Sequence, residues 1–101
     1  MGMYFIPVWE VDYYLGRPEF VFIDVRSYAE YSLGHLLGAG NFPLERIESW
    51  RTERFGEKIP IFYCERGSKS LRAAMEISAQ GRNAGNISGG ICCYQGRNWV
   101  R

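Results

Sequence analysis

Two short runs of consecutive apolar residues constrain most strongly what this 101-residue chain can fold into. The first run, residues 20–23, is followed by Asp24, and the second covers residues 59–63 with a proline near its beginning. Runs of this length are typical of strands buried on both faces, and an early proline is tolerated there. Because strand and helix patterns alternate along the chain, we predict an α/β fold, with a small, mainly parallel sheet flanked by helices on both faces.

Weaker patterns predict the other elements. Short strands are expected at residues 4–6, 39–42 and 86–88, and helices at residues 8–15, 27–33, 44–55 and 68–80. Leu44, Ile47 and Trp50 form a narrow apolar stripe in the third helix. In the second helix, Ser27 and Glu30 have the spacing of a capping box. The inner side of the last helix is expected to carry Leu71, Ala74, Met75, Ile77 and Ser78.

The composition fits one domain over residues 1–101 with a single modest core. Apolar residues make up 47% of the chain and charged residues 23%, which is ordinary for a globular protein. The 12 basic and 11 acidic residues leave a net charge of +1, which provides no strong attraction to nucleic acid or to an anionic membrane. The apolar runs are also far shorter than the roughly 20 residues of a membrane-spanning helix. We therefore expect neither nucleic acid nor membrane as a partner.

Cysteine and histidine usage narrows the possible chemistry. Three cysteines are too few for a disulfide framework, and with one histidine and no Cys-x-x-Cys pair they predict no metal site. The first residues lack the basic start of a signal peptide. We expect a cytoplasmic protein with reduced thiols.

Cys64 is the most informative residue. The strand at residues 59–63 delivers it to the carboxyl edge of the sheet, and a helix begins four residues later. Ligands bind at this edge in open parallel sheets. Loop amides and a helix N-terminus direct positive dipole ends at the sulfur and favour the nucleophilic thiolate. Cys64 is therefore the candidate nucleophile, and the alternative is a buried structural cysteine.

The residues after Cys64 form a candidate substrate-binding loop. Arg66 and Lys69 add positive charge, although both could equally be solvated surface residues. Gly67 allows a tight turn, and Ser68 or Ser70 can cap the helix and offer a hydroxyl to an anion. The negative charge of the Glu65 carboxylate would repel a neighbouring thiolate, so we expect the Glu65 side chain to point outward. The predicted loop comprises Glu65, Arg66, Gly67, Ser68, Lys69 and Ser70.

Two chemistries fit a cysteine in this position. Cysteine phosphatases place an arginine six residues after the nucleophile, where the guanidinium closes the loop around phosphate. Here Ser70 occupies that position, and Arg72 comes two residues too late. The loop is also short for a tetrahedral phosphate, so a smaller electrophile, a sulfane sulfur atom, fits it better.

Four segments in order resemble the single-domain rhodanese (thiosulfate sulfurtransferase-like) family. They are residues 22–26 with 28–31, residues 34–44, residues 63–70 with 72–74, and residues 89–91 with Tyr94. The family often has arginine where Lys69 stands, so the charge is kept but the bidentate fork is lost. A tryptophan is common where Tyr94 stands, and tyrosine keeps most of its volume.

The resemblance implies a double displacement at Cys64. The thiolate attacks the outer sulfur of a small donor such as thiosulfate, sulfite leaves, and a Cys64 persulfide remains. A thiol, cyanide or an acceptor protein then removes the sulfane sulfur, with ping-pong kinetics and without a cofactor. A non-enzymatic binding or persulfide-sensing module is the first alternative, and a phosphate-ester hydrolase is the second.

Several other residues are interpreted as structural. Asp24 and Arg26 are expected to pair at a strand end and fix loops, and His35 to order a loop by hydrogen bonding. Cys92 and Cys93 are expected to pack, with a resolving role for Cys93 as the alternative. The tail, residues 97–101, either folds back or stays mobile. The tryptophans are expected in the core or in a lid: Trp9, Trp50 and Trp99.

Overall fold

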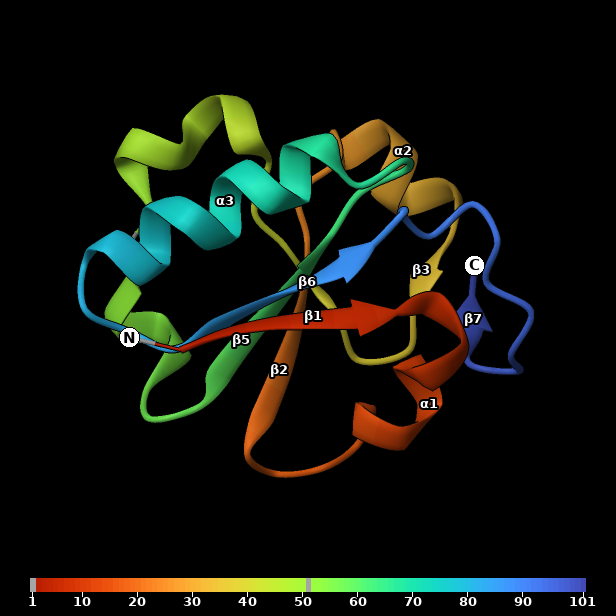
Figure 1. Ribbon diagram of the computed structural model, residues 1–101. Helices are drawn as coiled ribbons and strands as arrows, with labels where there is room; N and C mark the ends of the chain where they lie inside the picture. Colours follow the sequence, from red (N-terminus) through yellow and green to blue (C-terminus); the bar gives the residue numbers. More distant parts are fainter. Residues whose placement is uncertain (1, 51) are drawn as a thin grey trace.

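A five-stranded parallel sheet in the order β1-β6-β5-β2-β4 forms the centre of the molecule (Figure 1). The computed structural model describes residues 2–50 and 52–101. The strands are β1 (Met3–Pro7), β2 (Phe20–Asp24), β4 (Gly40–Asn41), β5 (Ile59–Tyr63) and β6 (Ala84–Ser88). A second, two-stranded antiparallel sheet joins β3 (His35–Leu36) to β7 (Trp99–Val100). The predicted α/β class and its parallel sheet are confirmed.

The two apolar runs lie side by side as β2 and β5, in register from Phe20 opposite Ile59 to Asp24 opposite Tyr63. Their side chains alternate between two buried clusters, one on each face of the sheet. Ile23 and Phe62 enter the cluster that contains α3, and Phe22, Ile61 and Tyr63 enter the other. This double burial explains why the runs are continuously apolar.

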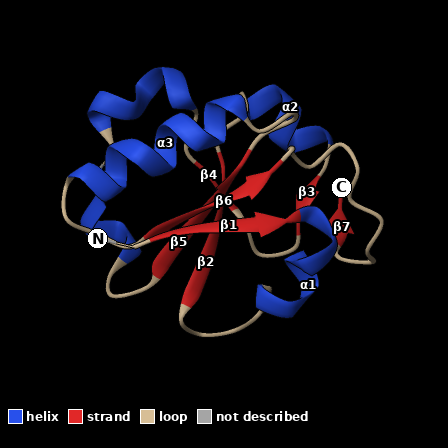
Figure 2. Cartoon of the chain, in the orientation of Figure 1, coloured by secondary structure: helices blue, strands red, loops and turns tan. Residues whose placement is uncertain are grey.

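Helices cover both faces, as predicted (Figure 2). One face carries α3 (Ser68–Ala79) together with two 3-10 helices, η2 (Leu44–Ser49) and η3 (Thr52–Phe55). The other carries η1 (Val8–Glu10) and α1 (Val11–Tyr14), where Val11 is fully buried. At the start of α2 (Tyr28–Leu33), Ser27 and Glu30 form the predicted capping box. Within the described ranges, no helix is long and apolar enough to cross a bilayer.

The single helix predicted at residues 44–55 is wrong, since the segment forms η2 and η3 instead. Arg46 has non-helical angles (φ −110°, ψ 21°), Trp50 is extended (ψ 138°), and residue 51 lies outside the described part of the chain. The stripe of Leu44, Ile47 and Trp50 repeats every three residues. That spacing matches the three residues per turn of a 3-10 helix better than the 3.6 of an α-helix.

The predicted inner face of α3 is wrong in part. Met75, expected inside, is 57% exposed, whereas Ala73 and Ala74 are fully buried. The helix therefore presents small side chains and Ile77 to the sheet, and this allows it to pack closely over β5 and β6.

The C-terminal tail folds back onto the domain as β7. Trp99 pairs with Leu36 of β3, and its indole covers the backbone of Gly34. A Cβ atom on Gly34 would overlap the indole nitrogen, so the glycine that ends α2 also makes room for the tail. The tail thus comes close to the end of β2, where the Arg26 guanidinium lies 5.4 Å from the centroid of the Trp99 ring.

Candidate active site

The Cys64 sulfur lies at the N-terminus of α3 and takes the place of a helix cap. Cys64 directly follows β5 and is 3% exposed. Its Sγ accepts hydrogen bonds from the backbone N–H of Gly67 (3.0 Å) and of Ser70 (3.4 Å). The N-cap residue is Gly67, which has no side chain that could cap the helix. Two amides and the positive end of a 12-residue helix therefore face the sulfur.

Two glycines allow the loop to take this shape. Gly67 has φ +102°, in the left-handed region, and a Cβ on it would lie 3.1 Å from the amide nitrogen of Gly89. Gly90 (φ +88°) lies against the loop from the other side, where a Cβ would overlap the carbonyl oxygen of Glu65 and the Cα of Arg66. The turn at residues 89–90 and the active loop thus meet backbone to backbone.

The segment after this turn is hydrogen-bonded to the loop. The Ile91 amide donates to the Cys64 carbonyl (2.9 Å), and the Cys92 amide donates to the Glu65 carbonyl (3.2 Å). These bonds fix the position of the nucleophile relative to the C-terminal part of the chain.

A buried polar pair supports the first turn of α3. The Ser70 hydroxyl lies 3.5 Å from the Cys64 sulfur, donates to the Gly67 carbonyl (3.1 Å) and contacts the Asn86 side-chain oxygen. Asn86, in β6, is 4% exposed. Asn86 was not predicted as a site residue, because its only signal in the sequence is a polar residue inside a short strand.

The expected pair of Asp24 and Arg26 is confirmed and extends to the active loop. The Arg26 guanidinium donates to both Asp24 carboxylate oxygens at 2.8–3.1 Å and to the Gly34 carbonyl at 2.6 Å. The third guanidinium nitrogen, Nη1, lies 3.5 Å from the Glu65 carboxylate. Burial lowers the pKa of Arg26, but the hydrogen bond and charge of Asp24 leave that pKa raised. The cation therefore joins β2, the end of α2 and the active loop.

Two further polar groups are ordered at this edge. His35 Nδ1 lies 2.8 Å from the Tyr31 carbonyl, and the ring stacks on Tyr31 with centroids 3.8 Å apart, so its predicted loop-ordering role is confirmed. Tyr63 accepts the Leu36 amide at 3.0 Å, and burial raises the pKa of its phenol far above the ordinary range.

Residues 10–96 match the model of the rhodanese-like domain. The chain belongs to the rhodanese-like domain family. Fold comparison agrees, because a rhodanese-related protein from Thermoplasma volcanium superposes with a TM-score of 0.80 over 96% of this chain and 97% of that one, at 20% identity. At this identity the likeness concerns the fold alone.

The similar sequences are mostly parts of longer proteins. The rhodanese-like domain is 33% identical over 81 residues (78% of this chain) to a probable molybdopterin-synthase adenylyltransferase of Pyropia yezoensis, of which it spans 21%. It is 32% identical over 89 residues (87% of this chain) to YqhL of Bacillus subtilis, spanning 71% of it. A tRNA sulfurtransferase of Desulfurococcus amylolyticus is 35% identical over 75 residues, 74% of this chain and 15% of that protein. Sulfur transfer is therefore the general class of function that family and relatives support.

The rhodanese-like domain brings only part of the predicted loop to the sulfur. Gly67 and Ser70 are buried beside it, whereas the remaining loop residues are exposed: Glu65, Arg66, Ser68 and Lys69. The Glu65 side chain is 51% exposed, in agreement with the outward direction expected for it. Ser68 was an alternative cap, but the sulfur takes that position. Substrate binding by the loop stays a prediction.

The arginine that could have served a phosphatase points elsewhere. The Arg72 side chain is 65% exposed and lies 3.8 Å from the Glu76 carboxylate, one helical turn further on. It therefore follows the surface of α3, which agrees with the spacing argument against a phosphate loop.

The packing expected of Cys92 and Cys93 is wrong, because both are exposed. Their segment uses its backbone to bind the active loop, so the side chains turn to the surface. Trp9 is also not a core residue, being 82% exposed. Trp50 is partly buried and packs against the core, with its ring stacked 5.7 Å from that of Phe62. Across residues 2–50 and 52–101, no group of three potential metal ligands occurs.

Proposed function

We propose that this protein is a sulfurtransferase that carries a sulfane sulfur as a persulfide on Cys64. The observation that carries the proposal is the position of the sulfur, which accepts the Gly67 and Ser70 amides at the N-terminus of α3. Such an environment stabilises negative charge on the nucleophile before and after sulfur is bound.

The first half-reaction loads Cys64. Its thiolate attacks the sulfane sulfur of an anionic donor such as thiosulfate, and a new S–S bond forms. The old S–S bond breaks, and sulfite leaves with its electron pair. Cys64 then carries the terminal sulfur as a persulfide anion. Arg66 and Lys69, both exposed on the loop, attract the anionic donor electrostatically.

The second half-reaction unloads Cys64. An acceptor thiolate or cyanide attacks the outer sulfur, and the S–S bond breaks toward Cys64. The products are an acceptor persulfide or thiocyanate and the regenerated thiolate. A general base is not required while the nucleophile is already ionised, so the scheme is a ping-pong reaction of one cysteine.

The direct test is the intact mass of the reduced protein after exposure to thiosulfate. We expect a gain of one sulfur atom that cyanide removes, and no gain in Cys64→Ser. The matched control is the double variant Cys92→Ser/Cys93→Ser, which keeps Cys64 and should still be loaded. Full thiosulfate:cyanide activity in Cys64→Ser would refute the proposal. Loading without turnover by any thiol or cyanide acceptor would instead support a persulfide-sensing module.

A further inference from the structure

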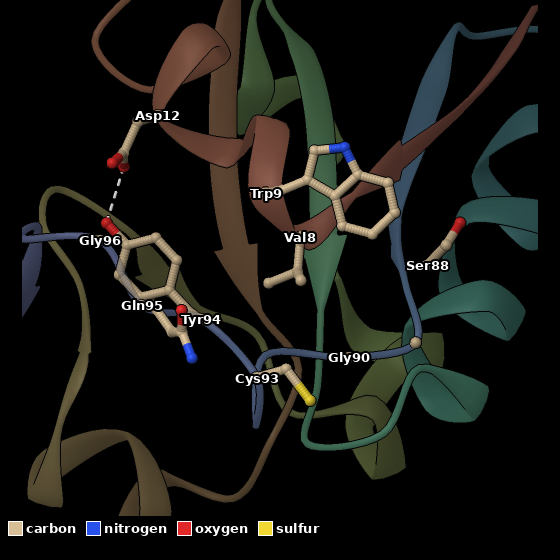
Figure 3. A pocket seen from close by; sticks show the side chains of 10 residues that line it. Val8, Trp9, Asp12, Ser88, Gly90, Cys93, Tyr94, Gln95 and Gly96 are labelled. Carbon is tan, nitrogen blue, oxygen red and sulfur yellow. Dashed lines mark hydrogen bonds between the residues drawn. The ribbon is translucent and has the colours of Figure 1, made fainter.

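Two thiols that the proposed reaction does not use lie side by side on the surface. Cys92 and Cys93 are both exposed, and their sulfur atoms are 3.8 Å apart. Cys93 lines a hollow of about 580 Å³ that Val8, Trp9 and Tyr94 also line (Figure 3). Cys92 lines a neighbouring hollow of about 370 Å³, which shares Tyr94 and Gly96 with the first.

The spacing of the two sulfur atoms suits a chelate. Bonds of about 2.3 Å from one central atom hold two sulfurs about 3.3 Å apart at a right angle and about 3.8 Å apart at the tetrahedral angle. The observed separation of 3.8 Å lies at the upper end of this span. Rotation of the two exposed side chains can bring the sulfur atoms to the shorter distances. The backbone beneath is held, since the Cys92 amide donates to Glu65. Once one thiol has reacted, the second is therefore present at high effective concentration.

The number of donors selects the ligand. Thiolates favour soft, thiophilic centres, but a structural zinc ion needs four protein ligands. Within the residues that the structure describes, no third histidine, cysteine or carboxylate joins this pair in a metal-holding group. A trivalent arsenic atom that already carries one organic group has only two bonds left to form. The hollow beside Cys93, with aromatic rings of Trp9 and Tyr94 in its lining, has room for that group.

We infer that Cys92 and Cys93 form a dithiol site for monosubstituted trivalent arsenicals. The step is a condensation in which two As–S bonds replace two As–OH bonds. Each thiol proton leaves with a hydroxide as water, and arsenic stays trivalent, so no electrons are transferred. The hydrogen bond with Cys93 raises the pKa of Cys92, so the Cys92 thiol keeps the proton that leaves as water.

The test is titration of the reduced protein with phenylarsine oxide, followed by native intact mass. We expect one adduct per chain in the wild type and in Cys64→Ser, because the site does not involve the nucleophile. Cys92→Ser and Cys93→Ser should each weaken binding at least about 100-fold, since only one bond remains. Excess dimercaptopropanol should release the arsenical, whereas an equal concentration of a monothiol should not.

Two results would overturn the inference. One is wild-type affinity in both single serine variants, which would show that the pair does not act together. The other is loss of the adduct in Cys64→Ser, which would assign the arsenical to Cys64. Serine is smaller than cysteine and both positions are exposed, so unfolding of the variants is not expected, and their circular dichroism spectra check this. Sulfur loading at Cys64 is measured separately, and its failure leaves this site untouched.

Discussion

Substitution of Gly90 by alanine tests the contact that fixes the active loop. Gly90 has φ +88°, and an added Cβ would overlap the Glu65 carbonyl oxygen and the Arg66 Cα. Both are backbone atoms, so no flexible side chain can move aside. We expect the methyl group to displace either the turn at residues 89–90 or the loop that provides the Gly67 amide to Cys64.

The expected cost has two parts. An L-residue with a left-handed backbone costs about 1–2 kcal/mol. Forcing extra volume into a packed contact adds about 1–3 kcal/mol. Gly90→Ala should therefore lower the free energy of unfolding by about 2–5 kcal/mol. Gly89 provides a matched control, since it has φ +80° but a Cβ there would meet no atom within 4 Å. Gly89→Ala should lose only the first part, about 1–2 kcal/mol.

Two measurements separate the contributions. Urea unfolding gives the free energy of each variant, and the rate of Cys64 alkylation at neutral pH reports the loop in a Cys92→Ser/Cys93→Ser background. We expect slower alkylation in Gly90→Ala, because the thiolate loses amide hydrogen bonds, and an unchanged rate in Gly89→Ala. Equal losses of stability in the two alanine variants, with equal alkylation rates, would refute the proposed contact between turn and loop.

Two further predictions concern the support of the active loop and the capping box of α2. Ser70→Ala leaves the Asn86 oxygen without its hydroxyl partner, so it should lower the free energy of unfolding by about 1–3 kcal/mol and slow the alkylation of Cys64. The control is Ser68→Ala at an exposed position, which should change the free energy of unfolding by less than about 0.5 kcal/mol. Equal effects of the two variants would contradict the supporting role of Ser70. Two hydrogen bonds lower the pKa of Glu30, the larger effect coming from the Ser27 backbone N–H and the smaller from the Ser27 hydroxyl. The ionised Glu30 carboxylate therefore stabilises the fold at pH values above about 4.3, the ordinary pKa of a glutamate, and this contribution is lost as the pH falls through the lowered pKa. The stability advantage over Glu30→Gln should shrink on acidification, and a pH-independent difference in urea unfolding would show that the carboxylate charge contributes nothing.

Patterns local in sequence predicted a large part of the fold. The apolar runs at β2 and β5 are unambiguous because both faces of these strands are buried, so no polar residue interrupts them. The capping box at Ser27 and Glu30 was equally readable, since its partners are three residues apart. The helix predicted at residues 44–55 failed because its stripe of three apolar residues, spaced three apart, was interpreted as α-helical although it fits a 3-10 helix better.

The candidate site likewise has a part that the sequence predicted and a part that it did not. Cys64, Gly67 and Ser70 all lie within the seven residues after β5, so the sequence placed the candidate nucleophile in one loop with the two residues whose amides donate to it. It did not identify Asn86 or Gly90 as supports of that loop, since each comes from a segment 16 or more residues away in the chain. Such contacts are set by strand order and by the register of β5 beside β6.

The amino-acid sequence by itself determined which chemistry is available: one thiol placed between a buried strand and a helix, with glycine where the backbone must turn. The tertiary structure alone decided which distant groups surround that thiol, and that Cys92 and Cys93 turn their sulfur atoms to the surface together. The physical reason is the distance along the chain over which each kind of interaction acts. Backbone preference and capping act over a few residues, whereas burial and close backbone contact depend on segments that meet only after the chain has folded.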